Sequence, residues 1–139
     1  ARSMDPEDVA KLMAWSHTNI CSDGSLAGGH PRGFGTFTRI LRRYVREEQH
    51  LSMEDAVHKM SGLAAEHMGI SDRGVIRVGA YADLVLFDPE RISDRATFED
   101  PKLTSTGVEK VWVNGSLVYT DSKPTGDYPG QVIHGGVTP

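Results

Sequence analysis

An aspartate, a histidine and an arginine lie close together in a glycine-rich stretch of this sequence. Asp23 follows a short run, residues 18–22, that is too short for a helix and that we expect to form a strand. His30 and Arg32 come within the next nine residues, in an expected loop. In barrels and in open α/β sheets, ligands and metals bind at the carboxyl ends of the strands. The sequence therefore predicts a carboxylate on such a rim, with a guanidinium on the loop above it.

Each of these side chains has a functional and a structural interpretation. A carboxylate such as Asp23 can transfer a proton, or it can simply organise the turn at Asp-Gly. Arg32 can bind a planar carboxylate through two parallel hydrogen bonds, or it can pair with a local acid. His30 can polarise a substrate or support Arg32, although a histidine before proline also fixes loop shape. Gly24 and its neighbouring glycines indicate close approach to a substrate or turn geometry, because their spacing matches no nucleotide-binding motif.

Helices are expected on both sides of this loop. Residues 5–7, Asp-Pro-Glu, are typical of a helix start. The loop is expected to extend to Gly35, after which apolar residues recur at helical spacing over residues 37–45. Residues 52–55 resemble a capping box, and the helix that they begin is expected to continue until Gly69.

The pattern changes from helical to β-rich after Gly69. Asn114-Gly115 predicts a tight hairpin, and we interpret the glycosylation sequon that it begins as a turn. The tail from Lys123 is rich in proline and glycine and is expected to wrap over a surface. We therefore expect two parts, residues 1–69 and residues 70–139. The predicted β-rich runs of the second part are residues 74–76, 82–88, 108–113 and 117–120.

Composition and charge exclude several classes of protein. With 38% hydrophobic and 24% charged residues over 139 residues and a net charge of −4, the chain is typical of a soluble globular protein with no basic surface for nucleic acid. The arginines of residues 39–46 are answered by Glu47 and Glu48 and are expected to form a solvated face. No run approaches the ~20 apolar residues of a membrane span, and no signal-peptide pattern is present. A single cysteine, Cys21, fits a reducing compartment and predicts a cytoplasmic location.

Three motifs follow one another in the first part: Ser22-Asp23-Gly24, His30-Pro31-Arg32 and Gly35-Thr36-Phe37. Together with residues 74–88 and 108–118, they resemble D-aminoacylases, the N-acyl-D-amino-acid deacylases of the amidohydrolase superfamily. The Gly-Ala-Tyr-Ala-Asp-Leu-Val pattern of the second part occurs widely across that superfamily, whereas the three motifs point to the deacylase branch. The likeness extends over nearly the whole chain.

This resemblance implies an α/β fold in which the chain is the C-terminal end of a (β/α)8 metal-dependent hydrolase barrel, followed by part of a small β-sandwich domain. A whole barrel takes about 250 residues, so neither part is expected to be complete alone. The resemblance implies a zinc ion whose ligands lie mostly outside this chain, because no His-x-His or other pair with ligand spacing is present. The expected partners are an N-acyl-D-amino acid and the missing N-terminal barrel portion, and a homo-oligomer is compatible with both.

The resemblance also assigns roles to the residues of the rim. Asp23 would take a proton from zinc-bound water and return it to the leaving amine, and it could contact the metal through that water. Arg32 would hold the substrate carboxylate, with His30 and Gly24 beside it. The products would be a carboxylate and a D-amino acid, and the chain alone is expected to be inactive.

Two alternatives stay open at this point. One is another amidohydrolase, such as a hydantoinase-like or dihydroorotase-like cyclic amidase, which would prefer cyclic imides to acyclic substrates. The other is a non-catalytic truncated module, which predicts exposed apolar surface where the other barrel strands belong.

Overall fold

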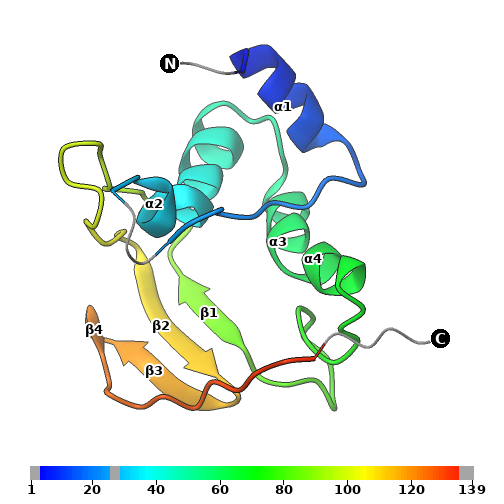
Figure 1. Ribbon diagram of the computed structural model, residues 1–139, viewed down its shortest axis with the longest axis vertical. Coiled ribbons are helices and arrows are strands. Elements are labelled where there is room, and N and C mark those ends of the chain that lie inside the picture. The colour runs from blue at the N-terminus through cyan, green and yellow to red at the C-terminus, as the bar shows by residue number, and fades with distance from the viewer. Residues whose placement is uncertain (1–3, 26–28, 135–139) are drawn as a thin grey trace.

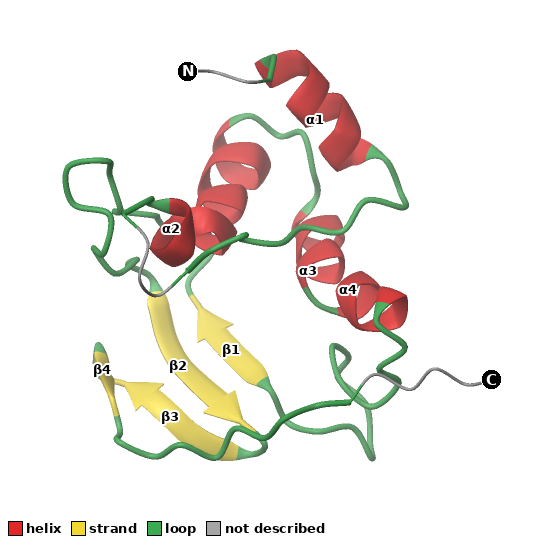
Figure 2. Cartoon of the chain, in the orientation of Figure 1, coloured by secondary structure: helices red, strands yellow, loops and turns green. Residues whose placement is uncertain are grey.

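Helices form the first half of the chain and a small sheet the second. The computed structural model describes residues 4–25 and 29–134, so the middle of the predicted glycine-rich loop lies outside the described residues. The helices gather on one side of the sheet (Figures 1 and 2). Within the described part of the chain, the sheet has four strands in the order β1-β2-β3-β4. The chain is therefore an α/β structure, as predicted.

Helix α1 (Pro6–Ala14) begins where the sequence predicts. The Asp5 carboxylate accepts a hydrogen bond from the Glu7 N–H at 2.8 Å, which satisfies a backbone donor that the first turn leaves free. Met13 faces inward from this helix and is buried.

The strand predicted over residues 18–22 is not formed in the described structure, where this segment belongs to no sheet. It is held instead by helix α3 (Met53–Met60): the Ile20 N–H donates to the Lys59 carbonyl oxygen at 3.0 Å. The Lys59 ammonium, buried to 5% exposure, donates to the carbonyl oxygens of Trp15 and Thr18 at 2.5 and 3.1 Å. A strand needs a neighbouring strand to complete its hydrogen bonds, and here a lysine and a helix end take that place.

The loop predicted to reach Gly35 ends earlier, because helix α2 (Arg32–Arg39) begins at Arg32. Pro31, with φ −60°, already has the backbone angle of a helix, so the chain enters the helix directly after it. Gly35 sits inside the helix where a Cβ would lie 3.2 Å from the Asp94 Cβ. Glycine at this position therefore allows close packing of the helix and does not provide loop flexibility.

The predicted amphipathic helix over residues 37–45 is present, but its second half is a π-helix, η1 (Ile40–Glu47). The Glu48 N–H donates to the Arg43 carbonyl oxygen, five residues back, at 2.7 Å. Two ion pairs have the same spacing: Arg42–Glu47 and Arg43–Glu48, each at 2.7 Å. Because a π-helix brings residues i and i+5 onto one face, the side-chain pairs and the wider turn support each other.

The helix predicted from Ser52 to Gly69 is interrupted. Its start is confirmed, since the Ser52 hydroxyl accepts from the Asp55 N–H at 3.0 Å. At Ser61 the backbone leaves helical geometry (φ −133°, ψ −81°), and α4 (Gly62–His67) begins as a separate helix. The Ser61 hydroxyl donates to the Val57 carbonyl oxygen at 2.6 Å, one way in which serine competes with the helical backbone pattern.

The sheet consists of β1 (Leu84–Phe87), β2 (Val108–Val113), β3 (Ser116–Thr120) and β4 (Lys123–Pro124), all antiparallel to their neighbours. The predicted hairpin is confirmed, because Asn114 and Gly115 both have positive φ, 49° and 81°. Residues 74–76 form no strand. Gly74 has φ +76° and packs so closely on helix α3 that a Cβ would lie 2.9 Å from the Ser61 carbonyl oxygen, so the chain turns there instead of extending.

The core lies among the helices and includes one residue that follows β1. Ile92, 1% exposed, packs in the same cluster as the buried helical residues. This packing holds the segment after β1 against the helices, and Asp94 of the same segment lies close to Gly35 of α2, the helix that carries Arg32. The other buried members of the cluster are Met13, Ile40, Leu41, Leu51 and Ala56.

Candidate functional site

The structure brings Asp23 and Arg32 together. The Arg32 Nη2 atom lies 3.0 Å from Asp23 Oδ2, and the two side chains are 47% and 80% exposed. Arg32 is the first residue of α2, and Asp23 ends the extended segment that precedes the loop. Exposed ion pairs typically contribute only about 0–1 kcal/mol. The pair is therefore weak, and it is the contact with a local acid that the structural interpretation of Arg32 predicts.

The turn at Asp23 is organised by its neighbour. The Gly24 N–H donates to the Ser22 hydroxyl at 3.2 Å, which leaves the Asp23 carboxylate to Arg32. Asp23 itself has φ 45°, a left-handed conformation that costs a non-glycine residue energy and that aspartate tolerates better than most.

His30 and Gly24 have structural contacts around this pair. His30 Nδ1 accepts the backbone N–H of Arg32 at 3.1 Å, so the imidazole supports the start of helix α2. A Cβ on Gly24 would lie 2.7 Å from the Cα atom of Gly33, which shows how closely the two ends of the loop approach each other. Both residues thus shape the loop that holds Arg32.

The segment over residues 94–105, which no motif in the sequence singles out, lies against α2 and its continuation η1. The Arg42 Nε atom donates to Asp94 Oδ1 at 2.7 Å, and the Ser105 hydroxyl donates to the Phe34 carbonyl oxygen at 3.1 Å. The hydrogen bond to Asp94, with help from Glu47, outweighs partial burial and raises the pKa of the Arg42 guanidinium. No pattern in the sequence links residues this far apart, so only the fold could reveal the contact.

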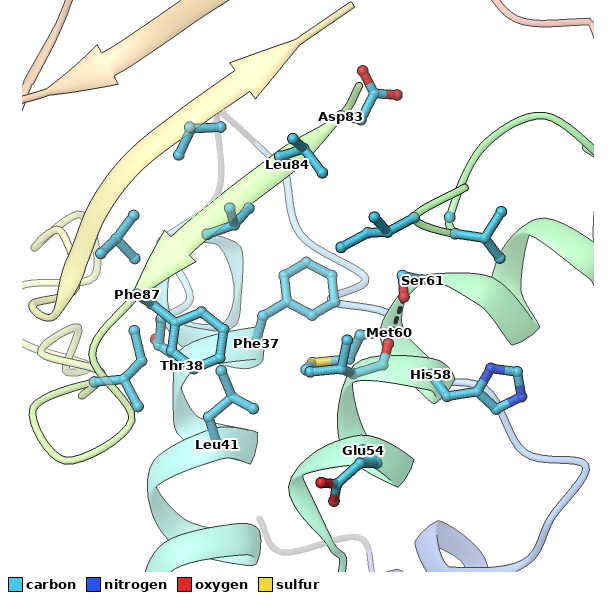
Figure 3. Close-up of a pocket in the computed structure, with 18 residues that line it drawn as sticks. Phe37, Thr38, Leu41, Glu54, His58, Met60, Ser61, Asp83, Leu84 and Phe87 are labelled. Atoms are coloured by element: carbon cyan, nitrogen blue, oxygen red, sulfur yellow. Dashed lines mark hydrogen bonds between the residues drawn. The ribbon is translucent and has the colours of Figure 1, made fainter. Parts of the chain in front are cut away.

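An apolar groove of about 680 Å³ lies between the helices and the sheet. Figure 3 shows Phe37, Met60 and Phe87 turned toward this space, with Glu54 and His58 at its margin. Asp23 and Arg32 do not line it. The groove is therefore separate from the candidate catalytic rim.

A second charged cluster joins the segment after α4 to the hairpin. Arg73 donates to the carboxylate of Asp83 and, at 2.7 Å, to Asn114 Oδ1, while the Asn114 N–H donates to Asp83 at 2.8 Å. Partial burial alone would raise the pKa of Asp83, but the Asn114 N–H and the Arg73 guanidinium outweigh it and lower that pKa. The Asn114 amide also donates to the Pro129 carbonyl oxygen at 2.7 Å, so the predicted turn residue is a junction for the tail.

The residues described here offer little to a metal ion on their own. No group of three or more His, Cys, Asp or Glu side chains in residues 4–25 and 29–134 could hold one. A catalytic zinc usually has three protein ligands, and at this rim Asp23 offers one carboxylate. In the same part of the chain, no helix is long and apolar enough to cross a membrane.

Comparison with known proteins identifies the family of this chain. Residues 16–119 match the amidohydrolase family, so the chain belongs to that family. It is 46% identical over 135 residues to the N-acyl-D-aspartate deacylase of Alcaligenes xylosoxydans xylosoxydans, covering 96% of this chain. It is 42% identical over 132 residues to the D-aminoacylase of the same organism, covering 94% of this chain. The resemblance to N-acyl-D-amino-acid deacylases is thus confirmed.

The fold agrees with a solved relative. The crystal structure of N-acyl-D-glutamate deacylase from Bordetella bronchiseptica, complexed with zinc and a phosphonate that mimics the tetrahedral intermediate of the reaction, has a TM-score of 0.86 and 42% identity over 93% of this chain. The match covers 27% of that structure, and the chain likewise spans 27% of the length of the two Alcaligenes relatives.

Proposed function

We propose that this chain is the C-terminal part of a zinc-dependent amidohydrolase that hydrolyses N-acyl-D-amino acids to a carboxylate and a D-amino acid. The observation that carries the proposal is the exposed Asp23–Arg32 pair, 3.0 Å apart, in a chain 46% identical to an N-acyl-D-aspartate deacylase. The single cysteine, Cys21, supports a cytoplasmic location for this activity.

Asp23 is the proton carrier in this proposal. Zinc, when bound, lowers the pKa of its water to about 7. The Asp23 carboxylate accepts a proton as a water oxygen attacks the amide carbonyl carbon, and it returns that proton to the amine nitrogen when the C–N bond breaks. Positioned proton transfer of this kind typically contributes 10²–10⁴ in rate.

Arg32 holds the substrate by its carboxylate, and this step frees Asp23. In the ion pair, Asp23 occupies the guanidinium that a substrate carboxylate would take. Binding of the substrate displaces Asp23 from Arg32 and leaves its carboxylate available as a base. His30 keeps the start of helix α2 in place during this exchange through its contact with the Arg32 N–H.

For the architecture, we propose that residues 1–69 carry the last strand and active-site loop of a barrel and that residues 70–139 form part of a small β-sandwich domain. The apolar groove and the side chains of Ile76 and Val78, 92% and 103% exposed, support this arrangement, because a monomer rarely leaves such surface in water. The segment over residues 18–22 would then find its strand partners in the rest of the barrel.

A hybrid enzyme tests the proposed activity. In this hybrid, the chain replaces the aligned quarter of the Alcaligenes D-aminoacylase. The soluble, folded hybrid should hydrolyse N-acetyl-D-methionine in a zinc-dependent reaction and leave the L-isomer intact. A folded hybrid without this activity would overturn the proposal.

The same hybrid separates the two alternatives. A cyclic amidase would hydrolyse cyclic imides faster than N-acetyl-D-methionine. A non-catalytic module would leave the folded hybrid without hydrolysis, and a well-behaved monomer of the isolated chain in light scattering would indicate an independent fold. The proposal expects the isolated chain to self-associate through its apolar surface and to lack activity.

A further inference from the structure

Phe98 is a large aromatic side chain held in the open beside the candidate site. Its side chain is 72% exposed, and its ring lies 5.0 Å from the ring of His30, edge to face at 75°. His30 in turn accepts the N–H of Arg32. The aromatic ring is therefore linked through His30 to the backbone of Arg32, the residue that we assign to the substrate carboxylate.

The loop that carries Phe98 is closed at its base and at its tip. Ser93 and Thr106 form a β-bridge, with hydrogen bonds of 3.0 and 2.9 Å. At the tip, the Thr97 N–H donates to the Asp100 carbonyl oxygen at 3.1 Å, and the Thr97 hydroxyl accepts from the Asp100 N–H at 3.0 Å. Phe98 lies inside this turn.

The loop is also fastened to helix α2 and its continuation. The hydroxyl oxygens of Thr38 and Ser105 lie 2.7 Å apart, and Ser105 also donates to Phe34. The Asp94 carboxylate, 8% exposed, pairs with Arg42 at 2.7 Å and with Arg39 at 3.5 Å. Helix α2 therefore carries Arg32 as its first residue, and the base of the Phe98 loop is attached to later residues of the same helix.

We propose that Phe98 is a specificity-determining residue that packs against the apolar side chain of the substrate's amino acid. This inference rests on the proposed function. A single exposed aromatic residue would mean little alone. Its place, held through His30 against the first residue of helix α2, is what carries the argument, because an anchored ring binds an apolar group with little loss of conformational entropy. We assign the amino-acid side chain as the group it meets, since the carboxylate on Arg32 and that side chain share the α-carbon, whereas the acyl group is attached one bond further away, on the amide nitrogen.

The test compares two substrates in the hybrid enzyme. Removing an apolar wall costs a bulky side chain more than a small one, and pocket contacts of a few carbon atoms discriminate substrates by about 10-fold to 200-fold. F98A should therefore lower kcat/KM for N-acetyl-D-leucine at least about tenfold relative to N-acetyl-D-alanine. F98Y, which keeps the ring, should leave the ratio unchanged. Y128A serves as the control, because Tyr128 is 93% exposed and lies in the tail.

Each outcome decides the matter. Equal loss for both substrates in F98A would show that the ring only supports His30 and would overturn the inference, as would no loss at all. F98L keeps an apolar side chain and should show an intermediate ratio, which guards against a folding defect in F98A. If the unmodified hybrid lacked D-selective hydrolysis, the proposed function would fail and the inference with it. An active hybrid whose substrate preference does not change in F98A would overturn this inference and leave the proposed function standing.

Discussion

The Asp23 carboxylate and the Arg32 guanidinium form an ion pair with an oxygen–nitrogen distance of 3.0 Å, although a glycine-rich loop separates them in the sequence. Because the pair is exposed, it contributes little free energy, and either group can exchange it for another partner. This relationship couples two proposed roles, because the same guanidinium cannot hold both Asp23 and a substrate carboxylate through all its donors.

Replacing Asp23 by asparagine in the hybrid should lower kcat by about 10²–10⁴, because an amide cannot take the proton. KM should stay equal or fall, since Arg32 no longer has a competing carboxylate. Steady-state kinetics with N-acetyl-D-methionine provides both values. D121N is a matched control, because Asp121 is another exposed aspartate with a positive φ, 52°. A kcat within a few fold of the unmodified hybrid would remove Asp23 from the chemistry.

Replacing Arg32 by lysine should raise KM more than it lowers kcat, because an ammonium ion cannot form two parallel hydrogen bonds with a carboxylate. The loss should disappear for a substrate whose carboxylate is replaced by an amide, since that substrate never used the guanidinium. R91K changes an exposed arginine elsewhere and should have no effect. An equal loss with both substrates would assign Arg32 to loop structure.

Lys59 should contribute to stability through the segment that leads to the site. K59M removes the two hydrogen bonds that the Lys59 ammonium donates to the carbonyl oxygens of Trp15 and Thr18. Leaving a buried acceptor without a donor typically costs about 1–3 kcal/mol. Urea unfolding of the hybrid enzyme measures this free energy. K11M, at an exposed lysine of helix α1, should unfold like the unmodified hybrid. Equal midpoints for the two variants would contradict the assignment.

Stability should fall in acid partly through Asp83. The pKa of Asp83 in the folded chain lies below its ordinary value of 3.8, so ionisation favours the folded state. This contribution is fully present above the unfolded-state pKa and is lost as the pH falls through the folded-state pKa, that is, below about pH 4. The free energy of unfolding of D83N should therefore change less steeply in this range. A similar slope for D83N and the unmodified chain would count against the role of the Asn114 N–H and the Arg73 guanidinium at Asp83.

The sequence by itself determined features whose hydrogen bonds are local. The caps at Asp5 and Ser52 and the hairpin at Asn114-Gly115 were predicted, because each depends on residues within three positions. The motifs around Asp23 and Arg32 also identified the family, since they match a known arrangement of residue types.

Only the tertiary structure decided the features that depend on distant partners. The segment over residues 18–22 joins no sheet in the described structure, because the groups that contact it come from Lys59. The break at Ser61 follows from the competing hydrogen bond of its hydroxyl, together with close packing against Gly74. The contact between His30 and Phe98 joins residues far apart in the chain, and no local pattern encodes it. Local hydrogen bonds are fixed by residue type and spacing, whereas long-range contacts exist only once the core around Ile92 has packed.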